Sequence, residues 1–342
     1  KAGMSVLVLE RNDVLGGATL SRQVFPGVDA RLSVYSYLVS LLPQKIIDDL
    51  DLKFQLRSRK TASWTPSFHD GKLRELLIQN NSSSANREAF AELTGSDKDY
   101  EGYLKLQELE ESVTKAIWPG LISPMVSREE LRSRLDKDTR IAWQALIEEP
   151  LGDLIEQHIS DDLIRGLVFT DGRIGVSTYP HDPSLLQNKS FLYHIIGGGT
   201  GEWKVPVGGM GVLVEQLYKV AHATGNTTFQ TNAKVIRIDN GARDSTVTFE
   251  HDEKEHQVDA RFVLCNASAH VLNQLTDEKS VPLDKVVEGA GFKINMLLKK
   301  LPKLLSDRHT AEDTFSGTVH IDEGYQQMIT SYQESMKGNI PT

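Results

Sequence analysis

The most constraining stretch of the sequence is Val6–Gly17, which reads VLVLERNDVLGG. Its apolar run, Val6–Leu9, is typical of a strand buried on both faces of a parallel sheet. Glu10 ends that run, and the pair Gly16-Gly17 follows six residues later. In dinucleotide-binding βαβ units, an acid in this place accepts hydrogen bonds from ribose hydroxyls, and a glycine turn lets the backbone approach a pyrophosphate. The stretch therefore predicts a nucleotide site, with an ordinary strand and turn as the alternative.

The motif Glu10-Arg11 with Gly16-Gly17-Ala18-Thr19 resembles the second half of the FAD motif of the phytoene-desaturase and amine-oxidase group of flavoproteins. The resemblance implies an α/β fold, in which a Rossmann-like (GR2-type) FAD-binding domain carries an inserted helical and antiparallel-sheet substrate domain. In that group a strand, a G-x-G-x-x-G turn and a helix come first, whereas Lys1-Ala2-Gly3 is similar to the last turn of that helix. We therefore expect a fragment that lacks both ends of its parent, binds FAD weakly or not at all, and shows no turnover by itself.

A second glycine motif lies at Val205–Gly211, which reads VPVGGMG and precedes the helical pattern VLVEQLYKVA. It resembles the P-x-G-G-M segment of the same group, a loop close to the flavin and the substrate channel. Gly208 and Gly209 would there allow the backbone to approach a flat ring system. The earlier Gly197–Gly199 run predicts an irregular loop and no phosphate site, because no strand precedes it and no G-K-[ST] follows it.

Strand patterns follow this second motif. Phe229–Ile238, Thr246–Glu250 and His256–Asn266 have the character of strands, and Asn240-Gly241 between the first two is a strong hairpin signal. By the resemblance, Val235 lies under the adenine. Phe262–Cys265 is predicted to be a second buried parallel strand, with Cys265 inert in the core. Asn266 and Ala267 at its end would face the cofactor edge.

The remaining chain divides by pattern into sheet and helix. Phe54–Leu77 alternates like a small antiparallel sheet with a hairpin turn at Asp70-Gly71, and 87–165 is helical, with a capping box at Ser127–Glu130. Leu20–Pro43 fits a buried helix or a pocket wall. Phe292–Leu298 resembles the start of the group's substrate-side sheet.

The resemblance covers nearly the whole chain and implies an order of domains. We expect residues 1–60 and 205–275 to form the FAD-binding domain, 61–204 a substrate and helical domain, and 276–342 an incomplete further part of the substrate domain. The candidate cofactor-binding residues are Glu10, Arg11, Gly16, Gly17, Ala18, Thr19, Gly208, Gly209, Val235, Asn266 and Ala267. The pattern identifies neither a catalytic residue nor a metal site.

Composition limits the partners. A net charge of −9 argues against nucleic acid, and a single cysteine excludes a disulfide framework, a C-x-x-C redox pair and a cysteine metal site. No apolar run is long enough for a transmembrane segment, while peripheral membrane contact stays open. We expect an intracellular protein, cytoplasmic or mitochondrial, that takes a small apolar substrate. The oligomeric state stays open.

Three functions fit these patterns. In the first, a flavin-dependent dehydrogenase or desaturase takes hydride equivalents from a C–H bond of an apolar, isoprenoid-like substrate. In the second, the same fold oxidises amines or amino acids. In the third, a non-catalytic flavoprotein or scaffold has kept the fold. A bound flavin that bleaches with a candidate substrate would separate the enzymes from the scaffold.

Overall fold

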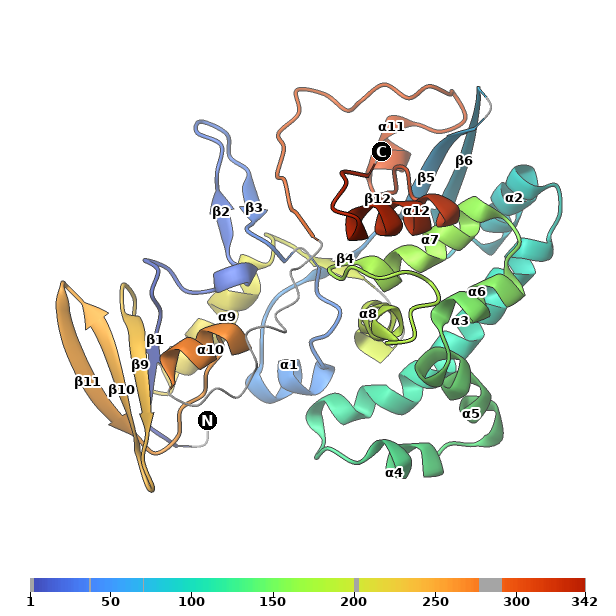
Figure 1. Cartoon of the computed structure of the whole chain (residues 1–342). Coiled ribbons are helices and arrows are strands. Elements are labelled where there is room, and N and C mark those ends of the chain that lie inside the picture. Colours follow the sequence, from blue (N-terminus) through green and yellow to red (C-terminus); the bar gives the residue numbers. More distant parts are fainter. Residues whose placement is uncertain (1–2, 37, 70, 200–202, 277–290, 342) are drawn as a thin grey trace. The chain divides into compact units, whose positions relative to one another are not determined.

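The computed structural model describes residues 3–36, 38–69, 71–199, 203–276 and 291–341 (Figure 1). The chain forms two compact units. Unit 1 consists of Lys1–Tyr37, Leu50–Gln55 and Pro206–Glu288, and unit 2 consists of Leu38–Asp49, Leu56–Val205 and Gly289–Thr342. Compared with the expected domain borders, residues 38–49 and 56–60 thus belong with the helical unit. The assignment of FAD to one unit and substrate to the other stays a prediction.

In its described residues, unit 1 consists of short sheets, α-helices and a 3-10 helix. Strand β1 (Val6–Leu9) pairs in parallel with β8 (Thr227–Gln230), in the register Val6 opposite Thr227. The 3-10 helix η1 (Gly17–Thr19) follows, and β2 (Ser21–Gln23) pairs antiparallel with β3 (Arg31–Ser33). Helix α9 (Gly211–Ala223) precedes β8, as the VLVEQLYKVA pattern predicted. The Leu20–Pro43 stretch is therefore not a helix, since its first half forms the β2–β3 hairpin.

An antiparallel sheet completes unit 1. Its strand order is β11-β10-β9, from β9 (Lys234–Asn240), β10 (Ser245–His251) and β11 (Lys254–Ala260), and α10 (Ala269–Leu275) comes after it. The predicted hairpin at Asn240-Gly241 is confirmed, because β9 and β10 pair antiparallel across this turn. The predicted Phe229–Ile238 strand is interrupted, since Asn232 adopts a left-handed φ of 51° between β8 and β9.

One strand predicted for unit 1 does not form, and another forms but is not buried as predicted. Phe262–Cys265 forms no strand, Phe262 is 67% and Leu264 96% exposed, and Cys265 is exposed as well. Hydropathy alone favoured a buried strand, but a parallel strand also needs a neighbour with which to share hydrogen bonds. The chain leaves the antiparallel sheet at the end of β11, and in the described residues β1 pairs with β8 alone. For the same reason β1 is not buried on both faces, and Val6 is 42% exposed.

Unit 2 combines a small sheet with a helical lobe. The sheet has the order β12-β5-β6, from β12 (Thr318–Val319), β5 (Thr61–His69) and β6 (Lys72–Gln79). The predicted hairpin is confirmed by the antiparallel pairing of His69 with Lys72, while Asp70 in its turn lies outside the described residues. Strand β4 (Leu56–Ser58) pairs with β7 (Lys204–Pro206). Phe292–Leu298 is not a strand, and Phe292 is 89% exposed.

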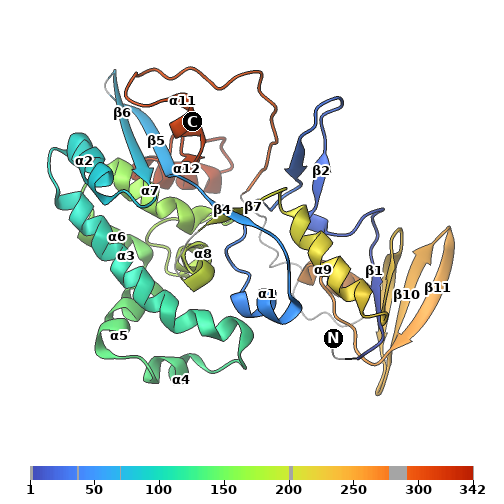
Figure 2. The ribbon, with the colours of Figure 1, turned by 180° about the vertical axis from the view of Figure 1, so that it is seen from behind.

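The helical prediction for 87–165 is confirmed. The helices of unit 2 are α1 (Gln44–Leu50), α2 (Ser83–Thr94), α3 (Lys98–Ile117), η2 (Trp118–Ile122), α4 (Arg128–Ser133), α5 (Lys137–Trp143), η3 (Gln144–Glu148), α6 (Leu151–His158), α7 (Asp162–Arg173), α8 (Leu186–Ile195), η4 (Gly197–Gly199), α11 (Ala311–Phe315) and α12 (Tyr325–Met336). Both views show α2 and α7 beside the β5–β6 hairpin (Figures 1 and 2). The core of unit 2 includes Phe90 of α2, Leu106 of α3, Ile155 of α6 and Phe169 of α7, all fully or almost fully buried.

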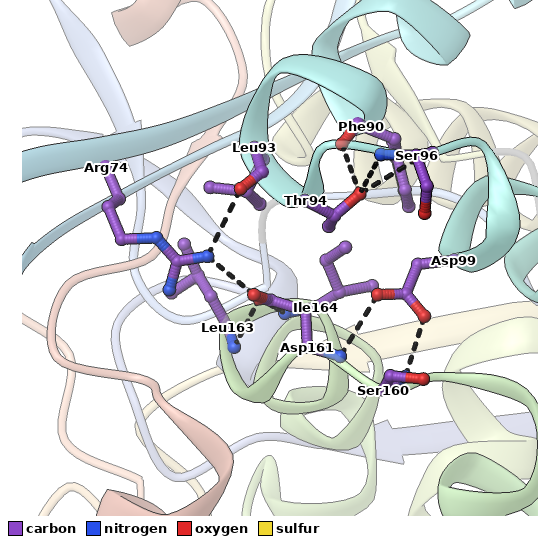
Figure 3. A network of polar contacts seen from close by, with 10 residues as sticks. All are labelled: Arg74, Phe90, Leu93, Thr94, Ser96, Asp99, Ser160, Asp161, Leu163 and Ile164. Carbon is purple, nitrogen blue, oxygen red and sulfur yellow. Dashed lines mark hydrogen bonds and ion pairs between the residues drawn. The ribbon is translucent and has the colours of Figure 1, made fainter.

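A polar network ties the helices of unit 2 together (Figure 3). The buried carboxylate of Asp99 accepts hydrogen bonds from the backbone N–H groups of Ser160 (2.7 Å) and Asp161 (3.1 Å). Asp161 in turn caps the start of α7 and forms an ion pair with Arg74 of β6 at 2.5 Å. Charge-assisted bonds of this kind satisfy backbone donors that helix ends leave open. One buried acid thereby joins α3 to the loop before α7.

Candidate functional site

The site in unit 1 begins where β1 ends. The N–H of Glu10 donates to the carbonyl oxygen of Gln230, and its carbonyl oxygen accepts from the N–H of Ala233, each at 2.9 Å. These bonds fix the backbone of Glu10 to the segment that joins β8 and β9. The Oε1 atom of its half-buried side chain accepts from the N–H of Asn12 at 2.8 Å. A carboxylate can accept about four hydrogen bonds, so Glu10 keeps the capacity to accept from two ribose hydroxyls.

The first glycine pair forms the turn that the sequence predicted. Gly16 has a φ of 123° and Gly17 a φ of 50°, in the region that favours glycine. Their carbonyl oxygens accept from Thr19 and Leu20, which closes η1. Within the described residues, the N–H groups of Gly16, Gly17 and Ala18 donate to no acceptor. Successive amides left open in this way form a place for an anion such as a pyrophosphate.

Ser21 joins this turn to the second glycine motif. Its buried hydroxyl oxygen accepts a hydrogen bond from the N–H of Gly211, the first residue of α9, at 2.8 Å. A Cβ on Gly209 would lie 3.0 Å from the same oxygen, and one on Gly16 would lie 3.1 Å from the Cγ2 atom of Val214 in α9. Both motifs therefore need glycine to approach each other. The structure brings together two segments that are nearly two hundred residues apart in sequence.

The other candidate residues are placed less closely. Val235 is half-buried in β9, two residues after Ala233, which binds the backbone of Glu10. Arg11 is exposed and Thr19 half-buried in the loop and turn after β1. Asn266 and Ala267 are exposed in the segment before α10, and the strand that was expected to carry them to the cofactor edge is absent. No described contact joins these last two residues to Glu10 or to either glycine motif.

Sequence reasoning missed Ser21. Its role depends on a partner 190 positions away, and the pattern around it, Leu20-Ser21-Arg22, is common. The one available signal is the alternation of small or apolar with polar residues in a short stretch directly after the glycine turn. Such alternation predicts that one face of a strand is buried, but it does not identify the buried partner.

The described residues offer neither a metal site nor a membrane-spanning helix. Within the part of the chain that the structure places, no three histidine, cysteine or acidic side chains come together as metal ligands. None of the described helices is both long enough and apolar enough to cross a membrane.

Comparison with known proteins shows the family. A family model for flavin containing amine oxidoreductases matches residues 1–321. The chain belongs to this family. It is an α/β protein of a family of FAD-containing oxidoreductases, and FAD is the cofactor that the family membership supports. The predicted resemblance of the chain to this group of flavoproteins is thereby confirmed at the level of the family.

The chain is also similar to individual relatives and to solved structures. An uncharacterised protein of Mycobacterium tuberculosis is 38% identical over 348 residues, which cover 100% of this chain and 63% of the relative. The mouse pyridine nucleotide-disulfide oxidoreductase domain-containing protein 2 is 26% identical over 387 residues, with 100% and 64% coverage. A redesigned putrescine oxidase is similar in fold, with a TM-score of 0.50, 19% identity, and coverage of 82% of this chain and 57% of that one. The chain thus spans somewhat less than two thirds of the length of these relatives.

Proposed function

We propose that unit 1 is the FAD-binding part of an oxidoreductase in which hydride equivalents pass from a substrate C–H bond to the flavin. The observation that carries the proposal is the contact between the two glycine motifs through Ser21 and Gly211. It places an open row of amides and the start of α9 next to each other. Both are suited to a ligand that combines phosphates with a flat ring.

Each candidate residue would bind a different part of the cofactor. The carboxylate of Glu10 would accept hydrogen bonds from the adenosine ribose, and the amides of Gly16, Gly17 and Ala18 would donate to the pyrophosphate. Arg11 and Thr19 would lie beside these groups. Gly208 and Gly209, with φ of 91° and 82°, would let the backbone approach the ring system, and Val235 would pack under the adenine. Asn266 and Ala267 are proposed at the cofactor edge on the resemblance alone.

FAD, when bound, supplies the acceptor for the hydride equivalents, while the protein binds, orients and excludes water. Unit 2 is proposed as the substrate part. By the resemblance, the first substrate class is a small apolar and isoprenoid-like molecule. The family description and the putrescine oxidase fold support a second class, amines. The net charge of −9 weighs against a nucleic-acid partner. An intracellular location, cytoplasmic or mitochondrial, is part of the proposal.

A flavin titration tests the proposal. FAD fluorescence is followed with the wild-type chain, with Glu10→Ala, and with Asp13→Ala as the matched control, because Asp13 is an exposed acid of the same loop that pairs with Arg22. Loss of hydrogen bonds to a charged acceptor, worth about 1.5–3 kcal/mol, predicts roughly tenfold or more weaker binding for Glu10→Ala. The titration extends to millimolar FAD so that weak binding is measured as well. Equal affinities of Glu10→Ala and wild type would remove Glu10 from the site.

Turnover separates the substrate classes. The flavin-loaded protein is mixed without oxygen with a polyisoprenoid, a diamine or an amino acid, and the loss of flavin absorbance is followed. Bleaching by the polyisoprenoid supports the first class, and bleaching by an amine supports the second. FAD that binds and bleaches with none of them would support neither substrate class.

A further inference from the structure

An apolar tip protrudes from the helical lobe of unit 2. It consists of Leu121–Val126, which reads LISPMV and comprises the end of η2 and the first part of the connection to α4. Met125 is 98% exposed, Leu121 47%, Ile122 44% and Val126 39%. Figures 1 and 2 both place this connection, beside α4, at one end of unit 2. Four large apolar side chains within six residues of an exposed connection need an explanation, since single exposed apolar residues are common but runs of them are not.

The local structure holds the apolar tip in place. Helix α3 ends at Ile117, before Pro119, and the Ser123 hydroxyl donates to the carbonyl oxygen of Pro119 at 2.7 Å. On the other side, the hydroxyl oxygen of Ser127 caps α4 by accepting from the N–H of Glu130 at 3.1 Å. This bond confirms that Ser127 is the N-cap residue of the predicted capping box. Hydrogen bonds therefore hold the backbone on both sides of Met125, and the apolar side chains of the segment are exposed.

Two arginines follow the apolar tip directly. Arg128 and Arg132 lie one helical turn apart on α4, and both approach the same Oε1 atom of Glu148, at 3.7 and 3.4 Å. With Glu129 they line a surface hollow of about 420 Å³. A guanidinium has five N–H groups, so each arginine can bind a phosphate oxygen while it keeps its contact with Glu148. Glu129 and Glu148 balance the two positive charges. The hollow would therefore bind a phosphate through hydrogen-bond donors and not through a strong positive potential.

The exposed apolar area of the tip indicates whether a protein partner or a membrane surface covers it. Full burial of a side chain of this size hides on the order of 100 Å², so the four partly exposed side chains offer about 230 Å². A stable protein interface needs about 800 Å² from each partner. Insertion at a membrane surface has no such minimum, because each apolar side chain that enters the acyl boundary contributes separately. An apolar tip next to arginines also matches the order of layers in a membrane, with acyl chains below phosphates.

We propose that the apolar tip inserts into a phospholipid surface, with Arg128 and Arg132 on lipid phosphates. The interaction holds the protein at the membrane face without a spanning helix. It is independent of the flavin site, since every residue in it belongs to unit 2. A protein that binds there gains access to apolar molecules that partition into the bilayer.

Vesicle sedimentation tests the proposal with phosphatidylcholine vesicles that contain no or one third phosphatidylglycerol. Met125→Asp is expected to lower the bound fraction about tenfold or more, since a fully exposed Met contributes roughly that factor when buried. Exchange of Arg128 and Arg132 for Gln is expected to weaken binding several-fold, most on the anionic vesicles. Leu305→Asp is the matched control, because Leu305 is 83% exposed in the same unit and lies outside the apolar tip.

A spectroscopic readout locates the contact. Cys265 is the single cysteine of the chain, so Met125→Cys on a Cys265→Ser background carries one environment-sensitive dye. A blue shift on addition of vesicles is expected. The proposal is overturned if wild type and Met125→Asp bind vesicles equally, if neither binds, or if Leu305→Asp loses binding to the same extent. It is also overturned if the wild type forms a dimer that Met125→Asp abolishes, because the occupant is then a second copy of the chain.

Discussion

Replacement of Ser21 by Ala removes the bond that joins the two glycine motifs. The N–H of Gly211 then loses its acceptor at a position where Ser21 is only 3% exposed, so water cannot easily take its place. An unsatisfied buried N–H costs about 1–3 kcal/mol, which raises the unfolded fraction of unit 1 roughly 5- to 150-fold. The Cβ of alanine keeps the packing against α9. The loss is therefore one of hydrogen bonding alone.

Hydrogen exchange measured by mass spectrometry is the suitable assay, because a chain of two units need not unfold in a single transition. Peptides from η1 and from the start of α9 are expected to exchange faster in Ser21→Ala, while peptides of unit 2 keep their rates. Arg22→Ala is the control, since its neighbouring side chain makes an exposed ion pair worth about 0–1 kcal/mol. Unchanged protection at both motifs in Ser21→Ala would refute the view that Ser21 joins them.

Three further outcomes follow from unit 2. Asp99→Ala leaves two backbone N–H groups unpaired and is expected to lower the unfolding free energy of unit 2 by about 2–5 kcal/mol in urea titration. Gly152→Ala places a Cβ 2.7 Å from the His181 ring and should cost about 1–3 kcal/mol, whereas Gly120→Ala, with nothing within 4 Å, should cost little. Burial raises the pKa of Glu110 to about 8 from 4.5, so the folded state binds its proton more tightly and stability falls as pH rises from about 4.5 to 8. Glu110→Gln should remove that fall, and an unchanged slope of stability against pH would contradict it.

The sequence was sufficient to predict the parts of the fold that depend on local chemistry. The hairpin at Asn240-Gly241, the helical stretch and the cap at Ser127 all follow from turn residues and spacing within a few positions. The positive φ of Gly16 and Gly17 follows from the same kind of signal. These features can be predicted without knowing which residues the segment packs against.

The errors concern features that depend on distant partners. Phe262–Cys265 has the hydropathy of a buried strand, but whether such a run becomes a strand depends on a hydrogen-bonding neighbour that no local pattern reveals. The prediction of a strand at Phe292–Leu298 is wrong for the same reason. The contact between Ser21 and Gly211 was missed because it joins two short, common patterns. A resemblance to a family could order the segments, but it could not identify the residue that brings them together.

The central claim is that the two glycine motifs form one FAD site, and glycine-selective nuclear magnetic resonance tests it most directly. The chain is labelled with ¹⁵N-glycine, the signals of Gly16, Gly17, Gly208 and Gly209 are assigned by substitution, and FAD is added. The method detects weak binding and reports a change in the environment of each labelled amide. The account predicts that these four signals shift together with one dissociation constant, while those of Gly120 and Gly338 in unit 2 stay in place. Saturable binding that leaves the four signals unmoved would contradict it.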